Sequence, residues 1–288
     1  MELHSSTFTG FKAELEIKAR IELGETPEVK KETLIELKRL IEKVPDLIPL
    51  MEDDFLIRFL RVSKFDVQRA LKRILKYYEV KNKYSKIYTD FLPSEMKATL
   101  DMNMLITLPK HPSFGPTIFW ARMGQFDSSK GTLTDVAALA IIKGEIDLQI
   151  ESSQIHGAHI ILDFKDCTLQ QLYQLSSVSI AKMYIKYLQE CWPCRLKGFH
   201  VIYEPLPMHH FCLFIATFLP KKLKQRVYIH GDDVKSLHQY IPSETLPPEL
   251  GGAAESINMH KYQSFVLSQE AYIQKLNQYG FIKNTKPH

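Results

Sequence analysis

The first third of the chain carries apolar residues at intervals of three and four, which predicts helices. One helix is expected to begin after Thr26, because a capping hydroxyl there precedes Pro27 at the first helical position. The clearest helix follows Asp66, and its apolar residues form one stripe as far as residue 78. The basic face opposite that stripe is typical of a solvated helix surface, although it could also contact phosphates. Between these two helices, Asp53 and Asp54 can cap a shorter one.

From residue 117 the pattern changes to short apolar runs that alternate with helical segments. Four runs are predicted as strands, at 117–121, 158–164, 198–203 and 226–229. Helices are expected at 134–150, 169–189, 211–219 and 233–240. Strands that are apolar on both faces and connected by helices indicate an α/β sheet with parallel connections covered by helices.

The segment 211–219 has no ionisable carboxylate or amine and is apolar on nearly every helical face. Pro220 ends it, and a basic cluster follows at once, formed by Lys221, Lys222, Lys224 and Arg226. The segment is too short to cross a bilayer, which needs about 20 apolar residues. It is therefore expected either as a buried core helix with a solvated basic tail or as a helix that touches lipid. In the second case, an anionic membrane surface would attract the cluster by about 1 kcal/mol per Lys or Arg.

The composition limits the class of protein. The 288 residues are 45% hydrophobic, which is enough for one large domain or for a small domain attached to a larger one. The formal net charge of +4 is too weak to indicate a nucleic-acid partner. Residues 1–13 contain no apolar signal-peptide core, and no segment reaches transmembrane length. We therefore expect a cytoplasmic protein whose membrane contact is peripheral and transient.

Candidate catalytic and metal-binding residues do not converge, and the chain has neither a glycine-rich phosphate loop nor a nucleophile elbow. Cys191 and Cys194 have the C-x-x-C spacing, but no second ligand pair accompanies them, so incidental thiols are favoured over a redox or zinc site. The adjacent His209 and His210 would point apart on a helix. Asp163 ends a strand, where ligand sites often lie, but it is equally typical of a structural turn. We expect no enzymatic activity, no metal and no cofactor.

Two groups of motifs are specific when their order and spacing are taken together. The first is the segment 54–61, DFLIRFLR, followed by Lys64, Phe65 and Asp66. The second contains RVYIHGDD at 226–233, LHQ at 237–239 and LPPELGG at 246–252. In these motifs the chain resembles the CRAL-TRIO lipid-binding family, most of all the branch of α-tocopherol transfer protein, cellular retinaldehyde-binding protein and the clavesins.

The resemblance implies an α/β fold, in which a helical N-terminal region precedes a mixed, mainly parallel sheet flanked by helices around a hydrophobic cavity. It divides the chain into a helical region at 1–95, a lipid-binding domain at 96–253 and a partly helical tail at 254–288. Family members hold one hydrophobic molecule in a closed cavity, and a mobile helix acts as its gate. The segment 211–219 corresponds to that gate.

The resemblance also assigns a role to basic residues beside the gate, which bind phosphoinositide headgroups in the tocopherol-transfer branch. The matching positions are Arg195, Lys197, Lys222 and Arg226, and all four are basic here. Lysine and arginine donors suit a multiply charged phosphate, which arginine can engage with two bonds. The phosphatidylinositol-transfer branch uses a Glu and a Lys inside the fold, where this chain has Cys194 and Arg226. The missing carboxylate argues against phosphatidylinositol as internal cargo, but not against phosphoinositide as an external membrane cue.

The apolar strands and the gate supply the residues expected around the pocket, although alternation along a strand does not reveal which face is the cavity side. These residues are Phe119, Ile160, Leu162, Val201, Phe211, Phe214, Ile215 and Phe218. The leading hypothesis is a monomeric carrier that delivers one small lipophile, such as a tocopherol, a retinoid or another isoprenoid, to phosphoinositide-containing membranes. A phospholipid cargo also stays open. The alternatives are a phosphoinositide-binding trafficking adaptor with a structural lipid, and a lipid-modifying enzyme, which the lack of a nucleophile–base set disfavours.

Overall fold

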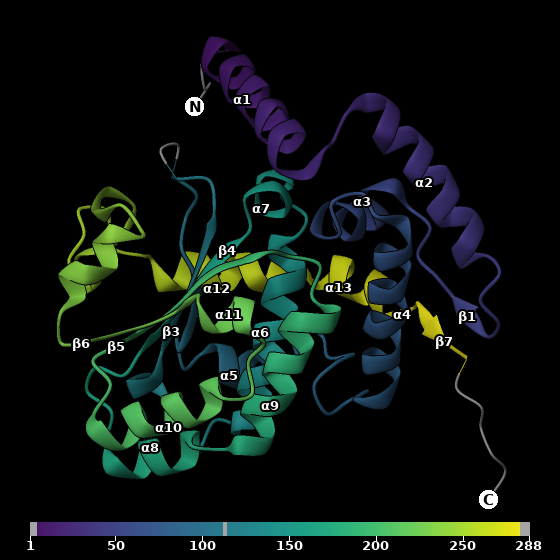
Figure 1. The fold of residues 1–288 in the computed structure, drawn as a ribbon. Coiled ribbons are helices and arrows are strands. Elements are labelled where there is room, and N and C mark those ends of the chain that lie inside the picture. Colours follow the sequence, from purple (N-terminus) through teal and green to yellow (C-terminus); the bar gives the residue numbers. More distant parts are fainter. Residues whose placement is uncertain (1–4, 112–113, 283–288) are drawn as a thin grey trace, which may run out of the picture.

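The computed structural model describes residues 5–111 and 114–282, with side chains from residue 12 onward. The N-terminal part is helical, as the spacing predicts, and shares one apolar core with the C-terminal helices (Figure 1). Its helices are α1 (Ser5–Leu23), α2 (Pro27–Ile41), α3 (Asp53–Val62), α4 (Val67–Lys83) and α5 (Lys97–Leu100). The C-terminal helices are α12 (Met259–Ser268) and α13 (Glu270–Asn277). After them β7 (Gly280–Phe281) pairs antiparallel with β1 (Leu47–Ile48), which ties the C-terminal segment to the N-terminal helices.

Helix capping follows the sequence at two of the three expected places. Thr26 and Asp66 cap α2 and α4, each accepting a hydrogen bond from a backbone N–H three residues later. The expected cap of α3 at Asp53 or Asp54 is wrong, because Glu52 holds the N-cap position without a side-chain bond. Asp53 and Asp54 lie in the first turn instead, where their charges complement the helix dipole.

A five-stranded mixed sheet lies at the centre of the molecule, with strand order β2-β3-β4-β5-β6. Its strands are β2 (Leu105–Thr107), β3 (Thr117–Arg122), β4 (Ala158–Asp163), β5 (Leu196–Ile202) and β6 (Val227–Gly231). The short β2 pairs antiparallel with β3, and the other neighbours pair in parallel. The predicted α/β fold with a mainly parallel sheet is therefore confirmed.

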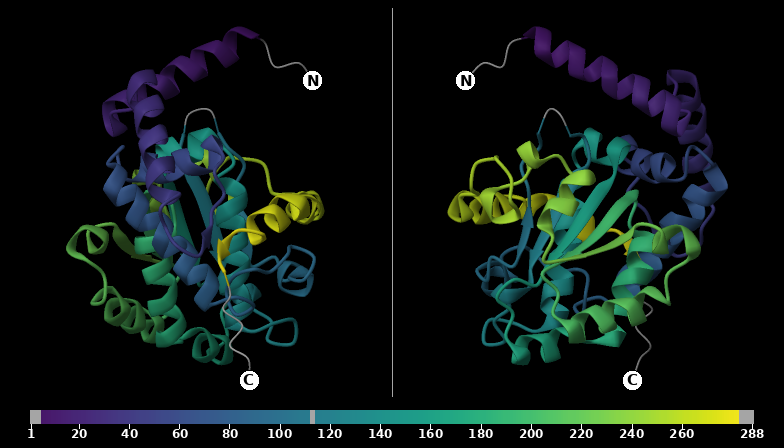
Figure 2. Two further views of the ribbon diagram at one scale, coloured as in Figure 1. Left: turned by 90° about the vertical axis from the view of Figure 1, so that its right-hand side faces the viewer. Right: turned by 60° about the vertical axis from the view of Figure 1, so that its left-hand side comes forward.

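Helices and short helical turns cover both faces of this sheet (Figure 2). One face carries α6 (Leu133–Asp147), α8 (Leu169–Leu175), α9 (Val178–Lys186) and α10 (Leu206–Ala216). The opposite face packs against the 3₁₀ helix η3 (Val234–Gln239) and α12. The remaining elements are η1 (Met123–Gln125), α7 (Glu151–His156), the π-helical turn η2 (Tyr187–Cys191), α11 (Lys221–Lys224), η4 (Ser243–Thr245) and η5 (Pro248–Leu250). None of the described helices has both the length and the apolar character needed to span a bilayer.

The helix predicted at 169–189 is divided into α8, α9 and η2. Ser177 accepts a hydrogen bond from the backbone N–H of Ile180 at 3.5 Å and so caps a new helix after α8 has ended. The helix predicted at 211–219 begins earlier, at Leu206, because Pro205 at the N-cap and Pro207 near the first turn suit a helix start. The segment 233–240, also predicted as a helix, forms the tighter 3₁₀ turn of η3.

Candidate functional site

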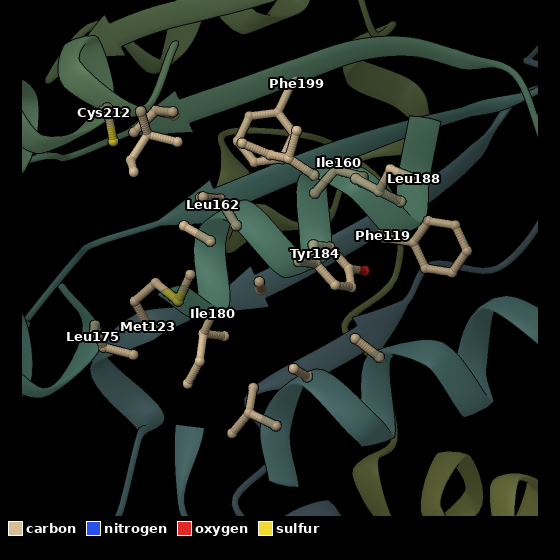
Figure 3. Close-up of a pocket in the computed structure, with 18 of the residues that line it drawn as sticks. Phe119, Met123, Ile160, Leu162, Leu175, Ile180, Tyr184, Leu188, Phe199 and Cys212 are labelled. Atoms are coloured by element: carbon tan, nitrogen blue, oxygen red, sulfur yellow. The ribbon is translucent and has the colours of Figure 1, made fainter. Parts of the chain in front are cut away.

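Apolar side chains line a cavity of about 260 Å³ between the sheet and the helices α6, α8, α9 and α10 (Figure 3). Alternation along β4 orients its side chains: Ile160 and Leu162 line the cavity, whereas Ile161 packs in the core of the opposite face. Protein interiors are otherwise packed like organic crystals, with few voids larger than a water molecule. A space of this size is therefore a candidate binding cavity.

Six of the eight residues predicted around the pocket line this cavity: Phe119, Ile160, Leu162, Val201, Phe211 and Ile215. The other two do not. Phe214 is 49% exposed and Phe218 is 40% exposed, and their rings pack against each other at 5.2 Å between centroids. Their exposure and their absence from the cavity lining place them on the outward side of this segment, whereas Phe211 and Ile215 face the cavity.

The outward side of α10 continues into an exposed apolar surface. On α10, Leu206 and Leu213 are exposed along with Phe214. On α8, which shares an apolar cluster with α10, Leu169 and Tyr173 are 80% and 86% exposed. Figure 1 shows these two helices side by side at the edge of the molecule. We call the exposed apolar residues of both helices and Phe218 the outer apolar surface; adjacent exposed groups of this kind are typical of a contact surface.

The basic residues predicted to bind phosphoinositide come from three neighbouring segments. Arg195 and Lys197 lie at the start of β5, and Arg226 immediately precedes β6 and donates to the carbonyl of Leu196. Lys222 is exposed on α11, one turn before Arg226. The sheet register, which pairs β5 with β6 in parallel, thus brings Arg195, Lys197 and Arg226 to the same sheet edge.

A carboxylate that the sequence did not reveal occupies this cluster. Glu22 of α1 lies 2.9 Å from Nη1 of Arg195 and 3.2 Å from Nζ of Lys197. Burial alone would raise the pKa of Glu22, but the hydrogen bonds and charges of Arg195 and Lys197 lower it to about 2. Burial lowers the pKa of Lys197, and the neighbouring charge of Arg195 lowers it further. The cluster therefore already binds one anionic group supplied by the chain itself.

The residues considered for catalysis or metal binding have structural partners. Asp163 accepts hydrogen bonds from Trp120 Nε1 and from the backbone N–H of Lys165, both at 3.0 Å. His209 contacts Glu204 at 3.3 Å. Cys191 and Cys194 are buried free thiols, and burial raises both pKa values, that of Cys191 to about 12. Over the described ranges, no group of three or more metal-ligating side chains is placed to hold an ion.

Several cavity residues were missed from the sequence. They come from α6 and from the segment that runs from α9 to Trp192, namely Val136, Ala137, Ala140, Ile180, Tyr184, Leu188 and Trp192. The small residues Ala137 and Ala140 leave room beside the sheet. In the sequence, alanine indicates only a good helix former and gives no sign of a cavity. Only the aromatic residues near the end of α9 give a signal, and it does not distinguish a cavity wall from a core.

Comparisons with known proteins agree with this architecture. Residues 101–252 match the model of the CRAL/TRIO domain, and residues 26–98 match that of a Pinta-like UBA domain. An alpha-tocopherol transfer protein-like protein of Homo sapiens is 31% identical over 258 residues, which are 89% of this chain and 75% of that protein. Clavesin-2 of Homo sapiens is 28% identical over 256 residues, covering 88% and 78%. The crystal structure of Sfh5 has the same fold, with a TM-score of 0.52 at 14% identity, covering 86% of this chain and 99% of Sfh5.

Proposed function

Because the chain belongs to the CRAL/TRIO family of lipid-binding and lipid-transfer proteins, we propose that it carries one small hydrophobic molecule to membranes that contain phosphoinositides. The cargo would be a tocopherol, a retinoid or another isoprenoid-like lipophile. The proposal includes a cytoplasmic location and transient contact with the membrane. The observation that carries it is the apolar cavity beneath α10, whose outer side is itself apolar and exposed.

The energy of the cavity supports a bound cargo. The wall of the cavity is almost entirely apolar, so it offers a hydrocarbon an environment away from water. Each CH₂ group that leaves water contributes about 0.8 kcal/mol to binding. Binding of this kind needs no covalent chemistry.

The two sides of α10 suit it to act as a gate. Phe211 and Ile215 contact the cavity, and Phe214 is on the exposed side together with Leu213. A helix that is apolar on both sides can exchange its contacts with the sheet for contacts with lipid at little cost. Opening at a membrane surface is therefore favoured over opening in water, which would expose both sides.

The basic cluster would make this opening depend on the membrane composition. We infer that phosphoinositide headgroups bind Arg195, Lys197, Lys222 and Arg226 when α10 contacts the bilayer. A ligand shifts a conformational equilibrium only by its differential affinity for the two states. The lipid phosphates would bind the open, membrane-bound state more tightly, so they would release cargo where phosphoinositides are present.

The experiment is cargo transfer between vesicles by wild type and by the double variant Lys222→Ala/Arg226→Ala. A matched control is Lys31→Ala/Lys261→Ala, which removes two exposed charges from α2 and α12. The first variant should slow transfer to phosphoinositide vesicles several-fold and leave equilibrium cargo binding unchanged, while the control transfers normally. Equal transfer by all three proteins would contradict phosphoinositide-dependent delivery.

A second function, a phosphoinositide-binding trafficking adaptor with a permanently bound lipid, is favoured by one observation: the basic cluster does not line the cavity. Headgroup binding could therefore operate without cargo exchange. The two functions differ in the lifetime of the bound lipid. A carrier exchanges its lipid with acceptor vesicles within the time of a transfer assay, and an adaptor does not.

A further inference from the structure

Lys143 of α6 brings an amine to the wall of the apolar cavity. Its side chain is only 3% exposed, and among the described residues that line the cavity it carries the sole amine, while none carries a carboxylate. The amine donates to the backbone carbonyl of Leu105 and lies 4.7 Å from the ring centre of Tyr262. A charged amine has three N–H donors, so one carbonyl and one ring face do not satisfy it. Donor capacity is therefore left over at the cavity wall.

The other buried basic side chains of the described chain have a carboxylate partner, which makes Lys143 an exception. The three pairs, with N–O distances of 2.7–3.5 Å, are Arg58 with Glu145, Arg61 with Glu25 and Lys81 with Asp90. Asp147, one turn after Lys143 on α6, accepts hydrogen bonds from Thr117 instead. The fold thus supplies counter-charges to its buried cations, but not to the one that lines the cavity.

A buried cation without a counter-charge is unfavourable, because the charge has left water and gained no partner. Burial accordingly lowers the pKa of Lys143 well below its ordinary value. The face of the Tyr262 ring attracts a cation more weakly than a carboxylate does. An anion bound beside Lys143 would stabilise the charged amine, so the missing partner can be supplied by a ligand.

The charge balance and the polarity of the wall select the kind of anion. One amine balances one negative charge, which a carboxylate carries, whereas a phosphate monoester carries about 1.5–2 near neutral pH. A phosphodiester lipid carries a single charge, but its remaining headgroup atoms would also need polar partners. The almost entirely apolar wall does not provide them. A lone carboxylate therefore suits this wall better than a phospholipid headgroup.

The cavity extends from Lys143 to an end without charged groups. Leu133 also lines it and lies ten positions earlier on α6, which corresponds to about 15 Å along the helix axis. Leu133 belongs to one apolar cluster with Met123 and Leu175, which Figure 3 shows close together at one end of the cavity. A hydrocarbon chain suits that end, since it offers no partner to a charge.

A carboxylic acid can also supply the proton that Lys143 needs. The acid leaves the membrane as a neutral molecule, and its carboxyl O–H bond breaks when the proton moves to the neutral Nζ of Lys143. The products are a carboxylate and an ammonium group, so the total charge inside the cavity stays zero. No isolated charge has to pass the apolar opening, which would be costly.

We propose that the cavity binds a lipophilic monocarboxylic acid, whose carboxylate pairs with the amine of Lys143 and whose hydrocarbon part extends towards Leu175. This inference rests on the proposed carrier function. It narrows the cargo from isoprenoid-like lipophiles in general to the acids among them.

The test uses three probes that share one branched hydrocarbon chain: phytanic acid with a carboxyl group, phytanol with a hydroxyl and phytane with neither. Dissociation constants at neutral pH are measured by equilibrium partition from neutral vesicles. The proteins are wild type, Lys143→Met, which keeps an unbranched side chain without the amine, and the control Lys235→Met, which makes the same change at an exposed position of η3.

Wild type should bind phytanic acid more tightly than phytanol. Lys143→Met should weaken the binding of phytanic acid about tenfold or more, as expected for the loss of a charge-assisted hydrogen bond. Its binding of phytanol and phytane should stay as in wild type, which also shows that the variant is folded. Lys235→Met should bind all three probes as wild type does.

The other outcomes separate the inference from the carrier function. If Lys143→Met weakens all three probes by the same factor, Lys143 only shapes the wall and the inference is overturned. It is overturned equally if the variant binds phytanic acid as tightly as wild type. If a folded wild type retains none of the three probes, the carrier function itself is contradicted, and the inference falls with it.

Discussion

The carboxylate of Glu22 in α1 lies 2.9 Å from Nη1 of Arg195, a residue 173 positions later in the chain. The same carboxylate is 3.2 Å from Lys197. If these two basic residues bind lipid phosphates, Glu22 competes with the lipid for them. The contact then sets the affinity of the resting protein for an anionic membrane.

The variant Glu22→Gln should therefore bind phosphoinositide vesicles several-fold more tightly than wild type, because the amide keeps the shape of the side chain and removes its charge. Co-sedimentation with vesicles measures the effect. Glu16→Gln is the control. Glu16 is exposed on the same helix, and its substitution removes the same charge. Equal gains for both variants would show that only the net charge of α1 matters.

The outer apolar surface should contribute to membrane binding independently of headgroup charge. Phe214→Ser/Phe218→Ser should weaken binding to neutral and anionic vesicles by at least tenfold, because burying one such side chain is worth about 1.5–3 kcal/mol. The control Phe265→Ser removes an equally exposed phenyl ring from α12, on the opposite face of the sheet. If the double variant binds vesicles as wild type does, α10 is not the membrane contact.

Filling the cavity should separate stability from cargo binding. Ala140→Leu places a larger side chain into the cavity from α6. The empty variant should gain about 1–2 kcal/mol in free energy of unfolding, while its affinity for cargo falls. Chemical denaturation without ligand and equilibrium binding measure the two effects. A loss of stability would mean that the site is already filled by well-packed protein atoms.

Acid should destabilise the fold through a row of three histidines on the sheet face opposite the cavity. His159 Nδ1 lies 2.9 Å from His200 Nε2, and His200 Nδ1 lies 3.0 Å from His230 Nε2. Burial lowers the pKa values of His159 and His200, to about 4 and about 3, and burial also lowers that of His230. Unfolded histidine titrates near 6.5, so the unfolded state takes up protons first as the pH falls. The stability from these neutral rings is complete above that pH and declines as the pH falls towards 4.

The measurement is the free energy of unfolding between pH 7 and pH 5. His159→Phe should make its decline with pH shallower, since one depressed histidine is gone and the ring can still pack against Phe114. His210→Gln, which removes an exposed histidine, should leave the pH dependence as in wild type. An identical decline in all three proteins would place the acid sensitivity elsewhere.

The fold could be predicted from the sequence because its strands carry a strong local signal. The apolar run at 158–164 and its turn signals specify β4 almost to the residue. The antiparallel β2 escaped prediction, because a three-residue strand inside an irregular segment has no periodicity to detect. The prediction of a single helix at 169–189 was wrong, because α8 ends at Leu175 and the side chain of Ser177 caps the start of a new helix.

The site was less accessible to sequence analysis, for physical reasons. Phe211 lines the cavity and Phe214 faces outward, yet the segment is apolar throughout and lacks the polar side that would orient a helix. Tyr184 and Trp192 line the cavity, and only the three-dimensional packing of the segment that follows α9 reveals this position. The pairing of Glu22 with Arg195 depends on how α1 lies against the sheet edge, and nothing in the local sequence of either residue encodes it.

The most direct test of the carrier function is mass spectrometry of the lipid retained by the purified protein after exposure to a tissue lipid extract. The account predicts one dominant hydrophobic species, close to one molecule per protein. A folded protein that retains no lipid, or a mixture of phospholipids in proportion to the extract, would contradict it.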